Sequence, residues 1–102
     1  MIVGSIVMAT RRTGVCEPGE IGVVYELYQD FDVDGGRAVS VIFSSGRYDG
    51  FSVAEQRHML SDTGLVDPFL AAYQFRNVMQ LDLDFERGLF DNALRGRVRR
   101  NP

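Results

Sequence analysis

The sequence predicts an α+β fold, in which a small antiparallel β-barrel formed by the first half of the chain is followed by a helical extension. A chain of 102 residues with 45% hydrophobic side chains can bury one core, so we expect a single globular domain. Apolar residues alternate with a period of two from Ile2 to Phe51, which is the period of β-strands. Signals for helix starts occur only from Ser52 onward, so the helices are expected to follow the strands.

The predicted globular domain covers residues 1–94, with the barrel at about 1–60 and a helix-strand-helix extension at 61–94. Residues 95–102 are expected to form a basic flexible tail. No apolar run approaches the roughly 20 residues needed to cross a bilayer. The apolar N-terminus has no basic residue before it, so it predicts a strand rather than a signal peptide. Because the single cysteine cannot form an internal disulfide, we expect a cytoplasmic protein.

Four segments of the first half predict the strands of the sheet. They are residues 2–9, 21–31, 37–44 and 47–51. Alternation in the second segment places four apolar side chains on one face: Ile21, Val23, Tyr25 and Leu27. The short turns between the later segments favour hairpin connections.

Two helix starts follow the strands. Ser52 and Glu55 have the spacing of a capping box and predict a helix over 54–60, which Thr63 and Gly64 would stop. Asp67 followed by Pro68 predicts a second helix continuing through 69–75.

Residues 78–86 alternate between apolar and polar side chains and predict one more strand. This strand would close the barrel, or would pair at a sheet edge with a second copy of the chain, so a homodimer is an open alternative. Apolar residues at helical spacing then predict a last amphipathic helix over 85–94.

Glycines and apolar residues recur with a spacing found in small barrels. They are Gly4, Val7, Gly19, Gly22 and Val23, followed by Phe43 and Gly46. With a strand, a loop and then Gly-x-x-Gly-Val entering the second strand, residues 3–60 resemble an SH3-like barrel of the KOW type. The resemblance implies binding of peptides, proteins or RNA rather than catalysis. KOW barrels are rich in lysine, whereas this chain has none and is acidic, so protein binding is favoured over RNA binding.

Charge is divided unevenly along the chain. All 11 basic residues are arginine, and four of them, Arg95, Arg97, Arg99 and Arg100, lie in the last eight positions. Residues 1–94 carry 7 arginines against 14 acidic residues, a formal charge of −7. Such a body repels polyphosphate, so nucleic-acid binding would depend on the tail together with Arg11 and Arg12. The small size and the exclusive use of arginine favour a bacterial origin.

The segment QDFDVDGG resembles the start of a calcium loop, because Asp30, Asp32 and Asp34 alternate before Gly35. The closing glutamate of such a loop is missing, since Val41 occupies its position. Aspartates followed by glycines are also typical of hairpin turns, which is the favoured interpretation. Weak cation binding stays open as the alternative.

No other pattern points clearly to catalysis. Cys16 and His58 are the members of a conceivable nucleophilic pair, but a surface thiol and an ordinary helix histidine are the simpler interpretation. Asp82 and Asp84 would lie on one face of the strand predicted at 78–86, about 7 Å apart, where a solvated face is favoured over an acid/base pair. One cysteine and one histidine cannot form a structural zinc site. We therefore expect no enzyme activity, no metal site and no cofactor.

The sequence is best interpreted as a non-catalytic protein-protein interaction module, such as a small adaptor or regulatory protein. Tyr28, Phe31 and Tyr48 are the predicted partner-binding residues, whereas Tyr25 and Phe51 have the strand phase of core residues. The alternative is a KOW-like RNA-binding module that uses the arginine-rich tail.

Overall fold

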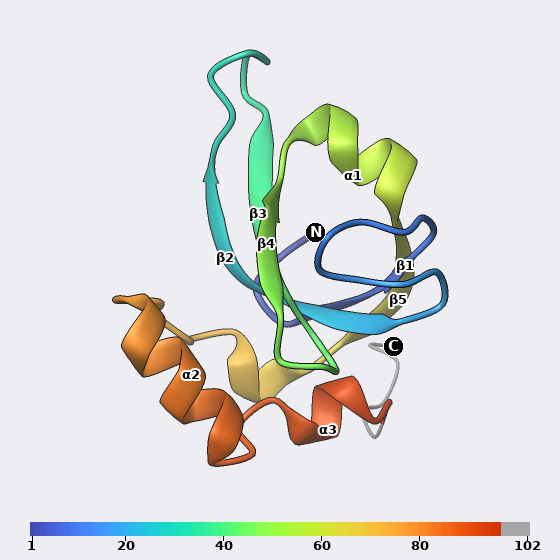
Figure 1. The fold of residues 1–102 in the computed structure, drawn as a ribbon. Helices are drawn as coiled ribbons and strands as arrows, with labels where there is room; N and C mark the ends of the chain where they lie inside the picture. Colours follow the sequence, from blue (N-terminus) through green and yellow to red (C-terminus); the bar gives the residue numbers. More distant parts are fainter. Residues whose placement is uncertain (97–102) are drawn as a thin grey trace.

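The computed structural model describes residues 1–96 of the chain. These residues form five strands, three α-helices and one 3-10 helix (Figure 1). In chain order they are β1 (Ser5–Ala9), β2 (Ile21–Gln29), β3 (Arg37–Phe43), β4 (Tyr48–Phe51), α1 (Val53–Met59), β5 (Leu60–Val66), η1 (Pro68–Leu70), α2 (Val78–Glu86) and α3 (Asp91–Leu94). The predicted α+β class is confirmed. The predicted tail residues Arg97, Arg99 and Arg100 lie outside the described residues.

The five strands form one antiparallel sheet in the order β4-β3-β2-β1-β5. The sheet is strongly bent, and α1 connects its two edge strands, β4 and β5 (Figure 1). Since β4 and β5 do not pair with each other, the sheet is open rather than closed into a barrel. The sequence therefore predicted the antiparallel sheet but not the way in which its edges are covered.

Both faces of the sheet are buried. The inner cluster lies on the concave face and consists of Val7, Ala9, Cys16, Val24, Val39, Val41, Phe43, Phe51 and Leu60. The outer cluster lies under η1, α2 and α3 and consists of Ile6, Val23, Tyr25, Ile42, Leu70, Leu81, Phe90 and Ala93. Every residue of β3 after Arg37 is consequently buried, which explains why its sequence is apolar on both faces apart from Ser40.

A bulge in β2 changes which residues share a face. The pairing of β2 with β3 shifts between Val24 and Glu26, so Tyr25 is the extra residue. Tyr25 packs in the outer cluster, whereas Leu27 contacts the inner one. Ile21, Val23 and Tyr25 therefore share one face, as predicted, whereas the prediction is wrong for Leu27.

The segment 78–86 is the helix α2 and not the predicted strand. The side chain of Asn77 caps this helix, because its Oδ1 accepts a hydrogen bond from the backbone N of Gln80 at 2.8 Å. Leu81 is fully buried and Phe85, one helical turn later, is half-buried against the same cluster. A segment of nine residues alternates by chance often enough that the period-two pattern was misleading here.

The fifth strand is instead β5, which follows α1 without a loop. It contains Thr63 and Gly64, the residues expected to stop the preceding helix. Gly64 has a φ of +79° and the strand pairs irregularly with β1, so its local sequence carries a weak strand signal. Dimer formation through an edge strand at 78–86 is excluded by this correction.

The predicted helix starts are confirmed, but two of the helices are shorter than expected. The capping box of Ser52 and Glu55 is present with both hydrogen bonds. Asp67 caps a single 3-10 turn rather than a helix over 69–75. Gly88, with a φ of +82°, separates α2 from α3 and thereby divides the helix predicted over 85–94.

Candidate interaction surface

The β2–β3 hairpin carries exposed apolar side chains at the end of the molecule opposite to α2 and α3 (Figure 1). Phe31 in the hairpin loop is 87% exposed and Tyr28 near the end of β2 is 40% exposed; with the exposed Val33 they form what we call the hairpin surface. Tyr48, the third predicted contact residue, is half-buried and packs against the outer cluster. The structure therefore exposes two of the three predicted residues freely.

Tyr28 lies on the outer face of the sheet, in a part that α2 does not cover. Its cross-strand partner is Ala38, whose side chain is buried. The tyrosine hydroxyl reaches Gly50 on β4, where a Cβ atom would collide with it. The aromatic ring consequently rests on a strip of small residues and holds a defined position on the sheet.

Negatively charged side chains influence the Tyr28 hydroxyl. Partial burial raises the pKa of Tyr28, and the nearby carboxylates of Glu26, Glu55, Asp49 and Asp30 raise it further. Glu26 is fixed by Ser40, whose hydroxyl donates to Glu26 Oε1 at 3.0 Å. Within residues 1–96 the one ion pair joins Arg12 to Glu17, so none of these four carboxylates pairs with an arginine there.

Tyr25 and Phe51 belong to the core, as the sequence predicts. Tyr25 packs edge-on against Phe75 with ring centroids 5.3 Å apart. Burial raises the pKa of Tyr25 to about 12, so this hydroxyl stays protonated at neutral pH. Phe51 packs edge-on against Phe43 in the inner cluster.

Asp30, the first aspartate of QDFDVDGG, is a structural residue. Its side chain is buried, with Oδ2 accepting from the backbone N of Val53 at 2.9 Å and Oδ1 from that of Asp32 at 3.1 Å. Because Val53 is the first residue of α1, this carboxylate ties the hairpin to the helix start. Asp32 and Asp34 point into solvent, and within residues 1–96 no three His, Cys, Asp or Glu side chains are arranged to hold a metal ion. The segment is a hairpin turn, as favoured from the sequence.

Replacement of Asp30 by alanine is expected to lower the free energy of unfolding by about 1–3 kcal/mol, because two backbone donors lose a charged acceptor. Urea unfolding followed by circular dichroism would measure the change. Asp34→Ala is the matched control, since Asp34 is exposed in the same loop and its loss should change stability by less than about 0.5 kcal/mol. Equal effects of the two substitutions would contradict the role assigned to Asp30.

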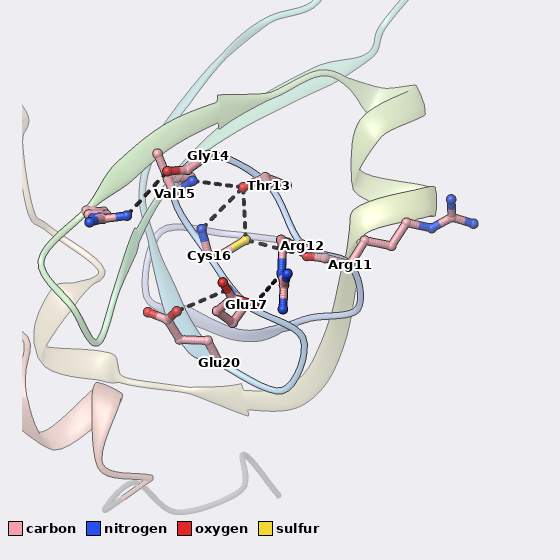
Figure 2. Close-up of polar contacts among 9 residues, drawn as sticks. Arg11, Arg12, Thr13, Gly14, Val15, Cys16, Glu17 and Glu20 are labelled. Atoms are coloured by element: carbon pink, nitrogen blue, oxygen red, sulfur yellow. Dashed lines mark hydrogen bonds and ion pairs between the residues drawn. The ribbon is translucent and has the colours of Figure 1, made fainter.

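The loop between β1 and β2 is organised around Thr13 and Cys16 (Figure 2). Thr13 Oγ1 accepts from the backbone N of Val15 at 3.1 Å and from that of Cys16 at 3.2 Å. The Cys16 thiol is buried in the inner cluster, 3.2 Å from Thr13 Oγ1, and donates to the Arg11 carbonyl at 3.8 Å. The prediction that Cys16 is a surface thiol is therefore wrong. His58 is exposed on α1 and does not bond to the thiol, so the conceivable nucleophilic pair is not formed.

The two arginines of this loop differ in their surroundings. Arg12 Nε donates to Glu17 Oε2 at 2.6 Å, so its charge is locally compensated. Arg11 is exposed and its side chain points away from the loop (Figure 2). Arg95 is exposed after α3, in a different part of the fold. Of the arginines considered for RNA contact, only Arg11 and Arg95 are therefore shown without a carboxylate partner within residues 1–96.

Asp82 and Asp84 do not form the carboxylate pair that a strand would have produced. On the helix α2 they lie two positions apart and project in different directions. Asp84 Oδ2 accepts from the Tyr73 hydroxyl at 2.8 Å, whereas Asp82 is exposed. Burial raises the pKa of Tyr73, and the bond to Asp84 raises it further. The arrangement fastens the η1–α2 connection rather than supplying an acid and a base.

A second set of exposed apolar side chains was missed from the sequence. Phe69 on η1 is 88% exposed and Met79 on α2 is 74% exposed; with the exposed Val78 and Leu83 they form what we call the helix surface. Met79 and Leu83 have the i, i+4 spacing of one helix face, which would have been visible if 78–86 had been assigned to a helix.

A depression of about 250 Å³ lies where the loop of the β2–β3 hairpin joins its strands, and it is lined by Gln29, Gly35, Gly36 and Arg37. The helices formed by residues 1–96 are all too short or too polar to cross a membrane. The chain has no significant match to a protein-family model, to a curated protein or to a solved structure.

Proposed function

We propose that this protein is a non-catalytic protein-protein interaction module that binds its partner through the hairpin surface. The observation that carries the proposal is the exposure of Phe31 beside a fixed, accessible Tyr28. Aromatic side chains held in water at a loop tip gain free energy when a partner buries them, and aromatic residues are frequent anchors of protein interfaces.

An open relative of the SH3-like barrel is the fold family that we propose. Support comes from five short antiparallel strands in the order β4-β3-β2-β1-β5, bent around one inner cluster. In such a fold, α1 replaces a short connection between β4 and β5 and covers the gap between these edge strands. The peptide and protein binding implied by the family resemblance agrees with the proposed function.

The alternative function is RNA binding in the manner of a KOW module. It would use Arg11 and Arg12 of the β1–β2 loop with Arg95, Arg97, Arg99 and Arg100 of the tail. The exposure of Arg11 favours it, while the pairing of Arg12 with Glu17 and the formal charge of −7 over residues 1–94 oppose it.

Affinity capture from a cell lysate tests the two functions against each other. The full chain, a 1–94 truncation and a Tyr28→Ala/Phe31→Ala variant are compared, each with and without nuclease. We expect a protein partner that survives nuclease and truncation but is lost, by tenfold or more, from the double variant, because the aromatic anchors are removed.

The control variant is Phe69→Ala/Met79→Ala, which removes equally exposed apolar side chains from the helix surface. It should leave capture unchanged if the hairpin surface is the binding site. Loss of capture in this control instead would place the interface, including a homodimer interface, on the helices. Capture that disappears with nuclease or with residues 95–102 would establish the RNA-binding alternative.

A further inference from the structure

The uncovered part of the outer sheet face combines one aromatic ring with uncompensated negative charge. Tyr28 lies over the small residues Ala38 and Gly50, where neither α2 nor α3 contacts the sheet. Glu26 lies on the same side of β2 as Tyr28, whereas Asp49 on the edge strand β4 stands opposite Val41 of the inner cluster and projects from the other face. Glu55 on α1 also acts on the Tyr28 hydroxyl.

The neighbouring arginines leave this charge uncompensated within residues 1–96. Arg37, Arg47 and Arg57 are exposed and form no ion pair there, and Arg47 donates to the Gly14 carbonyl. Glu26 and Glu55 each use one oxygen, Glu26 for the Ser40 hydroxyl and Glu55 for the Ser52 amide. Each therefore keeps a second oxygen that can accept a bond.

A guanidinium group is the chemical complement of this face. Its plane stacks on a tyrosine ring, and its five N–H donors reach neighbouring carboxylates at the same time. The carboxylates Glu26 and Glu55 repel a phosphate backbone, so a nucleic acid does not fit here.

We propose that the Tyr28 face binds an arginine-containing peptide segment of a partner protein, with the guanidinium stacked on Tyr28 and hydrogen-bonded to Glu26. The inference rests on the proposed function, because it assigns the partner's chemistry at the hairpin surface. Phe31 then contacts apolar residues that flank the arginine.

Fluorescence anisotropy with a labelled nine-residue peptide of the sequence LRGRVRRNP, identical to residues 94–102, tests the proposal on the full-length protein. A peptide with glutamine in place of each arginine is the matched probe. We expect the arginine peptide to bind at least tenfold more tightly than the glutamine peptide, and to bind more weakly as salt is raised.

Two variants that leave the net charge unchanged separate this site from general attraction to an acidic protein. Tyr28→Ala removes the ring, and Gly50→Ala displaces it, because the new Cβ meets the movable end of the Tyr28 side chain. Each should weaken binding about three- to tenfold, which is the range expected for one partly exposed cation–π contact. Circular dichroism confirms that the variants are folded.

Charge variants complete the test. Glu26→Gln, which keeps an acceptor for the Ser40 hydroxyl, should weaken binding by a similar factor, whereas Asp82→Asn on the distant helix α2 should not. The proposal is overturned if Tyr28→Ala binds the peptide as well as the unaltered protein, or if both charge variants weaken binding equally. If capture from lysate still depends on the hairpin surface in that case, the proposed function is supported, and only the inference that the partner binds through arginine is wrong.

Discussion

Replacement of Gly4 by alanine is expected to lower the free energy of unfolding by about 3 kcal/mol. Gly4 has a φ of +97°, and a Cβ atom there would lie 2.5 Å from the carbonyl oxygen of Asp67. Its backbone N donates to the Val24 carbonyl at 2.8 Å, and its own carbonyl accepts from Asp67 N at 2.9 Å. The residue therefore joins β2 to the end of β5, and an alanine would have to break one of these contacts or distort the backbone.

Gly19→Ala is the control that separates the strain of a positive φ from the collision with the Asp67 carbonyl oxygen. Gly19 also has a positive φ, +86°, but no atom lies within 4 Å of the position of its Cβ. Its replacement should cost about 1–2 kcal/mol, the strain of the left-handed backbone alone. Thermal and urea unfolding of both variants would give the difference. Equal losses would show that the contact with Asp67 contributes nothing.

The glycines of the predicted barrel pattern have different physical roles, which explains how much the sequence could reveal. Gly4 and Gly19 adopt positive φ, while Gly22 is required because a Cβ would overlap the side chains of Val41 and Phe43. A pattern of glycines thus predicts a tightly packed sheet. It does not predict whether the sheet closes, because closure depends on the pairing of β4 with β5 and on the helix between them.

Local signals were reliable where side chains act on their own backbone. The capping box of Ser52 and Glu55 and the cap of Asp67 are local interactions, and both were predicted. The strand β5 and the helix α2 were missed because tertiary packing decides them: β5 is held by β1, and α2 by the outer cluster.

In the candidate site, too, features that depend on local sequence could be predicted and features that depend on tertiary contacts could not. Exposure of Tyr28 and Phe31 follows from their positions at a hairpin end, so they could be proposed from the sequence. The burial of Cys16 could not, because it depends on packing against inner-cluster residues from distant strands, such as Phe43 and Leu60. Similarly, Asp30 reaches α1, 23 residues further along the chain, and no local pattern encodes that bond.

Leu81→Ala is expected to lower the free energy of unfolding by about 3 kcal/mol, within the range measured for leucines in protein cores. Leu81 is fully buried in the outer cluster, where it holds α2 against the sheet. Its neighbour of the same type, Leu83, is 43% exposed on the opposite side of the helix, so Leu83→Ala should cost less than about 1 kcal/mol.

This pair also discriminates between the two structures considered for residues 78–86. In a strand, Leu81 and Leu83 would point to the same face, and the two substitutions would have similar effects on stability. On a helix they are separated by about 200°, so only one of them can face the sheet. Urea unfolding of the two variants therefore tests the geometry. Similar losses of stability would contradict the helix α2 and favour a strand at this position. A difference of about 2 kcal/mol or more fits a helix that buries Leu81 and leaves Leu83 in solvent.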